Sequence, residues 1–387
     1  MEKIVDKINF PKDWNPFLVN ELGKVFKGKG ILKSEIQNSG FPCIRYGEIY
    51  TKYHYNFDKT ISYINTDTAQ KSREIKFGDI LFSGSGETAE EIGKAVAYVG
   101  GNKAYAGGDI VVLRPNEPNS GLFFGYLMNS DYVVQQKFQE GQGHSVVHIY
   151  GKSVERLKVI LPPLPEQQKI AAILSKWDEW IAEQTQLIAA KEKQKKGLMQ
   201  QLLSGEVRFP GFSEEWKEVK LKEIATITTG SSNREDSTLD GEFTFFDRSQ
   251  DIRTSSKYLF DKESIIVPGE GQAFIPKYFH GKFDLHQRTY AIFDFSDMNG
   301  KYLFYYISKN DKHLLSQAVG STVKSLRLPM FESMPILIPK IEEQDKIASL
   351  LTSSDEEIQS LKDELESVKL QKKGLMQGLL TGRLRVP

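Results

Sequence analysis

The dominant pattern of apolar and polar positions is a long helical repeat that the chain carries twice. Apolar residues recur in alternating steps of four and three over about five heptads, which is the spacing of a coiled-coil seam. In the copy nearer the C-terminus the seam is Ile347, Leu351, Ser354, Ile358, Leu361, Leu365, Val368, Lys372, Leu375 and Leu379. In the other copy it is Ile170, Leu174, Trp177, Ile181, Gln184, Ile188, Lys191, Lys195, Leu198 and Leu202. The pattern predicts two long helices that pack on each other.

The two helical copies match along their length without an insertion. Gln167 corresponds to Gln344 and Gly197 to Gly374, so the offset is 177 at both ends (344 − 167 and 374 − 197). One added residue would rotate everything after it by about 100° around the helix. Prolines precede both helices, and a glycine suited to a left-handed stop follows each: Pro162, Pro163, Pro165 and Pro339 before them, Gly205 and Gly382 after them.

Each helix follows a region with a mixed strand and helix pattern. In the first region we expect strands at residues 43–50, 78–82 and 109–114 and helical spacing over residues 121–140. The second region repeats the first more loosely. Trp216 corresponds to Trp14, and Gly269 and Gly271 correspond to a glycine pair that follows a similar apolar strand in the first region. The tryptophans differ by 202 (216 − 14) and the helices by 177, so the first region holds about 25 more residues.

The resulting plan is module, helix, module, helix. We expect the first module at residues 1–161, the first helical spacer at 162–210, the second module at 211–338 and the second spacer at 339–387. Because each helix leaves one module and ends near the next, the helices should run antiparallel. The predicted fold class is α+β, with two modules separated by two long repeated helices that form an antiparallel coiled coil with pseudo-two-fold symmetry.

Composition narrows the functional classes only a little. The chain has 51 basic and 51 acidic residues, so its net charge does not indicate a polyanion partner. A local basic face could still bind a polyanion. The single cysteine, Cys43, excludes an internal disulfide and a cysteine-rich metal site. The charged N-terminal residues and the absence of any membrane-length apolar run predict a cytoplasmic protein without a membrane partner.

The motifs that resemble nucleotide-binding, metal-binding or catalytic sites are each incomplete. The glycine pair in residues 83–87 lacks the third glycine of a dinucleotide loop, because position 89 is alanine, and no Gly-Lys-Ser/Thr follows it. His144 and His148 have a zinc-like spacing, but they fall in a segment that reads as loop and strand, and the second copy has serines at both positions. No Asn/Asp-Pro-Pro-Tyr/Phe methyltransferase motif is present. We therefore expect no catalytic and no metal site on this chain.

Basic and amide side chains interleaved with aromatics in glycine-rich loops are the candidate DNA contacts. Arginine, asparagine and glutamine can bond two atoms of one base edge, whereas lysine mostly holds phosphate. In the first module the candidates are Lys27, Lys29, Lys33, Arg45, Tyr46, Lys52, Tyr53, Ser145 and His148. In the second they are Asn233, Arg234, Arg248, Gln250, Gln272, His286, Gln287, Arg288, Thr322 and Lys324. Each residue alone could equally be a solvated surface residue, so only the whole set indicates DNA contact.

The helical repeats also resemble a known family. The Glu-Gln-x-Lys-Ile-Ala start and the Lys-Lys-Gly-Leu-Met-Gln-x-Leu-Leu-[Ser/Thr]-Gly end, most specific in residues 162–208 and 339–385, resemble the specificity subunit of type I restriction–modification systems. The resemblance implies that each module is a target recognition domain for one half of a bipartite site in double-stranded DNA. It implies that the helices are a spacer and a docking surface for two adenine-methyltransferase subunits, with restriction/translocase subunits in the full complex.

The resemblance further implies that no cofactor is bound by this chain, since S-adenosylmethionine, and ATP with magnesium, are expected on the partner subunits. The rival interpretation is a coiled-coil adaptor or scaffold whose two modules bind proteins. Salt-dependent binding to duplex DNA would separate the two.

Overall fold

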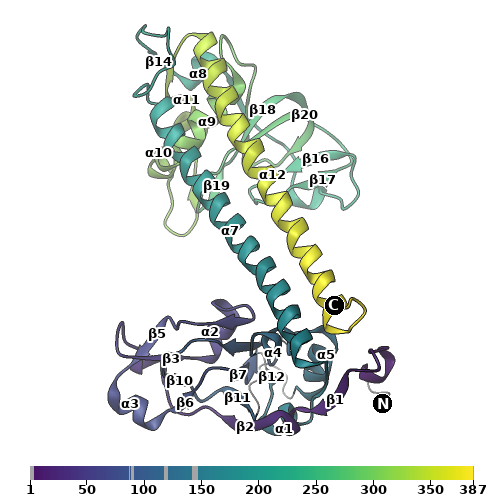
Figure 1. Ribbon diagram of the computed structural model, residues 1–387. Coiled ribbons are helices and arrows are strands. Elements are labelled where there is room, and N and C mark those ends of the chain that lie inside the picture. Colours follow the sequence, from purple (N-terminus) through teal and green to yellow (C-terminus); the bar gives the residue numbers. More distant parts are fainter. Residues whose placement is uncertain (1–3, 87, 89–90, 117–120, 142–146, 387) are drawn as a thin grey trace. The chain divides into compact units, whose positions relative to one another are not determined.

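The computed structural model describes residues 4–86, 88, 91–116, 121–141 and 147–386, and the chain divides into two compact units (Figure 1). Unit 1 comprises residues 1–183 and 365–387, and unit 2 comprises residues 184–364. Each unit therefore contains one module together with parts of both long helices. Within the described residues, no helix carries an apolar stretch long enough to span a bilayer.

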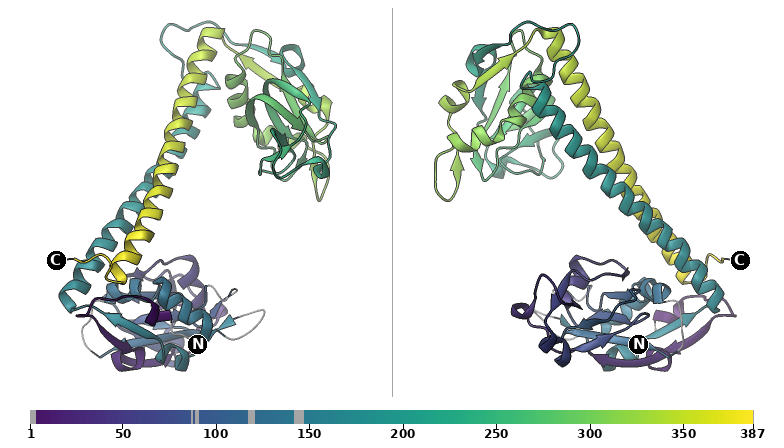
Figure 2. Two further views of the ribbon diagram at one scale, coloured as in Figure 1. Left: turned by 90° about the vertical axis from the view of Figure 1, so that its right-hand side faces the viewer. Right: turned by 60° about the vertical axis from the view of Figure 1, so that its left-hand side comes forward.

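The two long helices are α7 (Leu164–Leu202) and α12 (Ile341–Leu380), of 39 and 40 residues. Within each unit their segments lie side by side and run in opposite directions (Figures 1 and 2). Every seam position of both copies is buried or partly buried, which confirms the predicted coiled-coil packing. Gly205 and Gly382 have φ of 73° and 70°, so both helices end in the left-handed conformation that their glycines predict.

A lysine on the seam of unit 1 is paired by a carboxylate across the helices. Lys372 of α12 binds Asp178 of α7, and its amino group lies 5.3 Å from the centre of the Tyr126 ring. The hydroxyl of Tyr126 donates to Asp178 at 2.6 Å. Because Tyr126 belongs to the first module, this cluster joins the module to both helices.

The same cluster recurs in unit 2 with the same residue types. Lys195 of α7 binds Asp355 of α12 and lies 5.2 Å from the centre of the Tyr305 ring, whose hydroxyl donates to Asp355 at 2.7 Å. Further ion pairs join Lys191 to Glu357 at 2.5 Å and Lys362 to Glu192 at 2.7 Å. These pairs set the register of the two antiparallel segments.

A second repeated cluster fixes the start of each helix. In unit 1 the buried carboxylate of Glu166 accepts from the indole of Trp14 at 3.2 Å and from Arg385 at 2.8 and 3.0 Å. In unit 2 the carboxylate of Glu343 accepts from Trp216 at 3.2 Å and from Arg208 at 2.7 and 2.8 Å. The matched tryptophans thus hold corresponding places.

The second module is built on one mixed sheet of six strands. The spatial order is β15 (Thr226–Thr229), β21 (Thr289–Phe293), β18 (Phe260–Pro268), β20 (Lys277–Leu285), β16 (Phe243–Phe246) and β17 (Arg253–Ser255). Strands β18 and β20 are nine residues each and form a long antiparallel hairpin. Beyond β15 the backbone of Ser232 bonds to Leu285 and Gln287, so the sheet curls towards closure. Shorter pairs are β14 (Lys217–Lys220) with β23 (Pro335–Ile338) and β19 (Glu270–Gly271) with β22 (Lys324–Ser325).

The first module divides the same plan between two sheets. One has the order β2 (Gly23–Lys27), β11 (Ile110–Pro115), β7 (Ile80–Ser83), β9 (Ala95–Tyr98) and β4 (Asn56–Phe57), and the other has the order β5 (Ser62–Ile64), β3 (Phe41–Ile44), β10 (Ala104–Ala106) and β6 (Arg73–Ile75). The pairs β7–β9 and β6–β10 are an interrupted counterpart of the β18–β20 hairpin. Shorter pairs are β1 (Asn15–Leu18) with β13 (Lys158–Leu161) and β8 (Ser85–Gly86) with β12 (Val147–His148).

Short helices complete the modules. Those of the first module are η1 (Ile4–Lys7), α1 (Val19–Leu22), η2 (Lys33–Glu35), α2 (Tyr46–Thr51), α3 (Thr66–Lys71), α4 (Gly121–Leu127), α5 (Asp131–Glu140) and α6 (Gly151–Glu155). Those of the second are α8 (Leu221–Ile224), η3 (Arg234–Asp236), α9 (Gly300–Lys309), α10 (Asp311–Gln317) and α11 (Leu328–Glu332). In each unit one apolar core joins the sheet, the helices of the module and the long helices, with α4 in unit 1 and α9 in unit 2.

The prediction of one strand over residues 43–50 is wrong from Arg45 onwards. The strand β3 ends at Ile44 and the chain enters α2 at Tyr46. The carboxylate of Glu48 accepts from the backbone N–H of Arg45 at 2.9 Å, which satisfies a donor that is otherwise orphaned at a helix start. The strands predicted at 78–82 and 109–114 are confirmed as β7 and β11, and the helical spacing at 121–140 as α4 and α5.

Candidate nucleic-acid interface

The candidate residues of the second module meet where two parallel strands end. Strands β16 and β20 are parallel, with Phe246 opposite Leu285, so the residues that follow them emerge at one edge of the sheet. The backbone N–H of His286 donates to the carbonyl of Phe246 at 2.9 Å, and that of Gln287 to Ser232 at 2.9 Å. Three separate segments, at 232–234, 247–250 and 286–288, are thereby held together.

Two of the arginines at this edge share one carboxylate. Arg288 donates through Nη1 to both oxygens of Glu270, at 2.8 and 3.0 Å, and Arg248 donates through Nη1 at 3.2 Å. The Glu270 side chain is 18% exposed, whereas those of Arg248 and Arg288 are 54% and 58% exposed. The guanidinium groups therefore lie outward of the carboxylate that holds them.

A second carboxylate is shared in the same way. Asp247 is buried, and its Oδ2 lies 3.5 Å from Nε of Arg253 and 3.9 Å from Nε of Arg234. Ser249 donates to Oδ1 from its backbone N–H at 2.7 Å and from its hydroxyl at 2.5 Å. Burial alone would raise the pKa of Asp247, but the bonds from Ser249 and the two guanidinium groups outweigh it and lower that pKa.

The amide and imidazole groups of this edge are fixed by local bonds. The Gln287 amide donates to the side-chain oxygen of Asn233 at 2.5 Å, and the backbone N–H of Arg288 donates to Nδ1 of His286 at 3.0 Å. Burial, reinforced by the two neighbouring arginines, lowers the pKa of His286. At neutral pH the imidazole is therefore uncharged and offers Nε2–H as a donor. Gln250 is exposed in the same segment as Arg248.

The remaining candidates of the second module line one hollow of about 540 Å³. Its wall comprises Gln272, Leu315, Ser316, Ser321, Thr322 and Lys324. Strand β19, which carries Glu270, pairs with β22, which carries Lys324, so the hollow adjoins the arginine-bearing edge. The structure thus brings all ten candidates of this module into two neighbouring groups.

The first module repeats this edge with different side chains. Strand β3 is parallel to β10, with Ile44 opposite Ala106, so Arg45 and Tyr46 follow β3 at the edge where Lys29 bonds through its backbone to Ala106. Lys27 lies at the end of β2, 3.6 Å from Asp109, with both side chains more than half exposed. Exposed Lys33 begins η2, the counterpart of η3 with Arg234.

Other candidates of the first module lie elsewhere. Lys52 and Tyr53 follow the far end of α2, and Tyr53 packs against Phe57 with ring centres 4.7 Å apart, while burial raises its pKa to about 12. His148 lies in β12, where Nδ1 is 3.0 Å from the hydroxyl of Ser85. Ser145, with the rest of residues 142–146, is outside the described residues.

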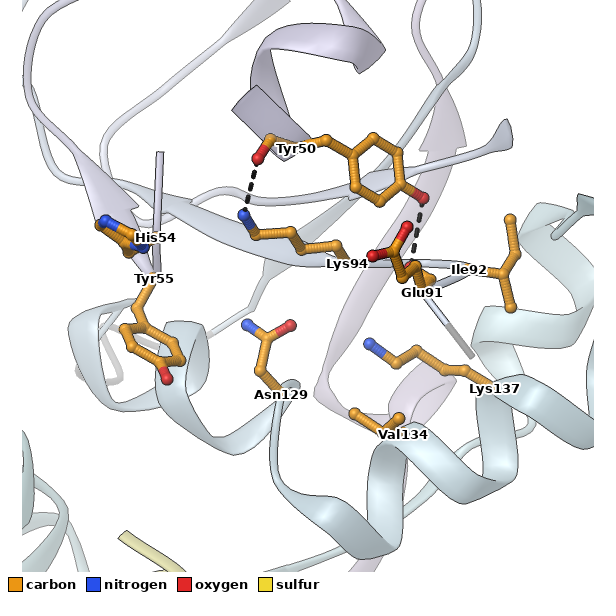
Figure 3. A pocket seen from close by; sticks show the side chains of 9 residues that line it. All are labelled: Tyr50, His54, Tyr55, Glu91, Ile92, Lys94, Asn129, Val134 and Lys137. Atoms are coloured by element: carbon orange, nitrogen blue, oxygen red, sulfur yellow. Dashed lines mark hydrogen bonds between the residues drawn. The ribbon is translucent and has the colours of Figure 1, made fainter. Parts of the chain in front are cut away.

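A hollow of about 350 Å³ in the first module is lined by two lysines, Lys94 and Lys137, whose pKa values are lowered by burial (Figure 3). Its lining comprises Tyr50, His54, Tyr55, Glu91, Ile92, Lys94, Asn129, Val134 and Lys137. Lys94 donates to the carbonyls of Tyr50 and Tyr53 at 3.2 and 2.7 Å, so it satisfies acceptors at the C-terminal end of α2. Lys137 is fully buried and donates to the carbonyl of Gly93 at 2.7 Å, and burial lowers its pKa to about 7.

Sequence reasoning missed three side chains that organise the second edge: Asp247, Arg253 and Glu270. The pairing of Asp247 and Glu270 with arginines depends on distant segments meeting at the sheet edge, so no local pattern in the sequence indicates it. Within the part of the chain that is described, no group of three or more histidine, cysteine, aspartate or glutamate residues is placed to hold a metal ion.

Two α+β modules with two long repeated helices, with basic side chains at a sheet edge of each module and amide side chains at that of the second, are the features expected of a protein with two nucleic-acid-binding modules. A family model described as the type I restriction modification DNA specificity domain matches residues 11–192 and 213–370. Because these matches cover most of the chain, the chain belongs to this family, the specificity subunits of type I restriction–modification systems, which recognise DNA sequence.

Individual relatives agree with this assignment. The type I restriction enzyme MjaVIII specificity subunit of Methanocaldococcus jannaschii is 25% identical over 98% of this chain and 95% of its own length. Among solved structures, the type I restriction-modification system S subunit from M. genitalium has a TM-score of 0.61 at 17% identity, covering 97% of this chain and 96% of the other. A chain solved in work on complex assembly and conformational transition of the type I R-M system also has a TM-score of 0.61 at 17% identity, covering 97% and 100%. The structural likenesses show a shared fold.

Proposed function

We propose that each module reads one half of a bipartite site in duplex DNA. The observation that carries this proposal is the gathering of arginine, asparagine and glutamine side chains from three segments at one sheet edge of the second module. Such side chains read base edges in the major groove, and lysines such as Lys27, Lys29 and Lys33 at the corresponding edge of the first module suit phosphate contact. Different side chains on matching edges would give the two modules different targets.

The long helices are proposed as the docking surface for two adenine-methyltransferase subunits. Several large apolar side chains of α7 and α12 are exposed away from the seam: Trp180 at 38%, Leu187 at 41%, Leu350 at 37% and Leu370 at 71%. Exposed apolar and aromatic groups of this kind are typical anchors for a protein partner. In this assembly, S-adenosylmethionine, and ATP with magnesium, would be bound by methyltransferase and restriction/translocase subunits. Methylation and cleavage would then be chemistry of those partners.

The test is to coexpress the chain with its methyltransferase subunit and to map methylated adenines by sequencing native DNA. We expect a bipartite motif. Replacing Arg288 with alanine should relax one or two positions in one half of the motif and leave the other half unchanged, since a good arginine–base contact is worth roughly 1–3 kcal/mol of discrimination. Lys222→Ala, an exposed charge in α8, is the control and should leave the motif intact. Methylation without a motif, or relaxation of both halves by Arg288→Ala, would contradict the proposal.

A further inference from the structure

We propose that Asp247 and Glu270 are positioning residues that aim the arginine array of the second module, defined as Arg234, Arg248, Arg253 and Arg288, and thereby set its sequence specificity. The inference rests on the proposed DNA-reading function and adds a role for two acidic residues that themselves repel DNA. Its basis is the sharing of each carboxylate by two arginines.

The arginine array contains more positive groups than negative ones. Four guanidinium groups face two carboxylates, so the cluster keeps a net charge of about +2 from its own members. The carboxylates are the inner partners, with the Asp247 side chain 3% and that of Glu270 18% exposed. Three of the cations lie outside them, with the side chains of Arg234, Arg248 and Arg288 60%, 54% and 58% exposed, while that of Arg253 is 33% exposed. Positive charge is therefore presented to a partner while negative charge is kept behind it.

The contacts leave much of the hydrogen-bonding capacity of the arginines available. Arg288 and Arg248 both use Nη1 for Glu270. A guanidinium has five N–H donors in a rigid fork, so the remaining edge can bond two acceptors of one guanine. Holding one corner of the fork fixes the direction of the other corner.

Both carboxylates are themselves held by the backbone framework. Asp247 follows β16 directly and accepts two bonds from Ser249, while Glu270 lies in β19, opposite Ser325 of β22. Arginine carries about 2 kcal/mol of rotamer entropy, which a free side chain loses on binding. Anchoring the side chains before DNA arrives reduces that loss for the orientation that reads the right base.

Removing one of these carboxylates should affect specific and nonspecific DNA binding in opposite ways. Glu270→Gln keeps the shape and removes one negative charge, so attraction to phosphates stays equal or rises. Arg248 and Arg288 lose their fixed aim, so the preference for the cognate site falls. A residue that only supported the fold would lower both affinities together.

The experiment measures affinity of the methyltransferase-bound complex for a cognate duplex and for a scrambled duplex at several salt concentrations. For Glu270→Gln and, separately, Asp247→Asn, we expect the ratio of cognate to scrambled affinity to fall roughly tenfold, within the range that one arginine–base contact supplies. Methylation mapping should show relaxation in one half-site only. Asp261→Asn, an exposed acid at the far end of β18, is the charge-matched control and should leave the ratio unchanged.

An unchanged ratio in both variants would overturn the inference, as would a parallel fall of both affinities with a lowered melting temperature. The wild-type complex separates this outcome from failure of the proposed function. If the wild type itself shows no preference for a cognate duplex, the proposed function fails. If it shows the preference and the variants keep it, only the positioning role fails.

Discussion

Lys195 and Lys372 occupy seam positions where a coiled coil ordinarily places an apolar residue. Each is paired with an aspartate of the opposite helix and lies over a tyrosine ring of its module. An unpaired charge in such a place would cost several kcal/mol, so the aspartates make the lysines tolerable. The pairs share the offset of the repeat (355 − 178 and 372 − 195 are both 177), and that coincidence in the sequence could have revealed them.

Lys137 predicts a pH dependence of stability for the first module. Its pKa is about 7 in the folded chain against an ordinary 10.5, because burial disfavours the charged amine. Between pH 7 and 10.5 the unfolded chain therefore binds a proton that the folded chain has released, and this lysine makes unfolding costlier as the pH rises. The slope is up to about 1.4 kcal/mol per pH unit. Lys137→Met should lack this increment.

The measurement is denaturant unfolding at pH 7, 8 and 9, followed in wild type, Lys137→Met and Lys152→Met. Lys152 is an exposed lysine of the same module, and its variant should keep the wild-type pH dependence. Equal slopes for Lys137→Met and wild type would show that the buried amine stays protonated in the folded chain.

At the scale of elements, the two long helices depend on burial of one seam. Leu351 of α12 is fully buried in the core of unit 2, together with Ile347 and the helix α9. Leu370, on the same helix, is 71% exposed. The same substitution at these two positions therefore distinguishes the seam from the outer surface.

Replacing Leu351 with aspartate should destabilise unit 2 by roughly 3 kcal/mol or more, because it removes a buried leucine and places a carboxylate in an apolar core. Circular dichroism on heating would show a lower melting temperature and earlier loss of helix. Leu370→Asp should melt like wild type. If Leu351→Asp also melts like wild type, the seam does not hold the helices together.

At the scale of the whole molecule, periodicity predicted the duplicated helices and the module–helix alternation, since a heptad seam is a local and repeated signal. The sheet topology was not predictable in the same way. The meeting of residues 232–234, 247–250 and 286–288 depends on a parallel β16–β20 pair and on the curling of the sheet. Residue type alone was enough to predict Arg248 and Gln287 as candidate base contacts. The roles of Glu270 and Asp247 depend on those non-local pairings, so they could not be predicted from the sequence.

The proposed division of labour is that the two modules read separate halves of one DNA site. Its most direct test exchanges residues 211–337 for the equivalent part of a family relative and maps methylation by the hybrid complex. We expect one half of the motif to change to that of the relative while the other half stays as in wild type. A hybrid that folds and methylates but changes both halves, or neither, would contradict it.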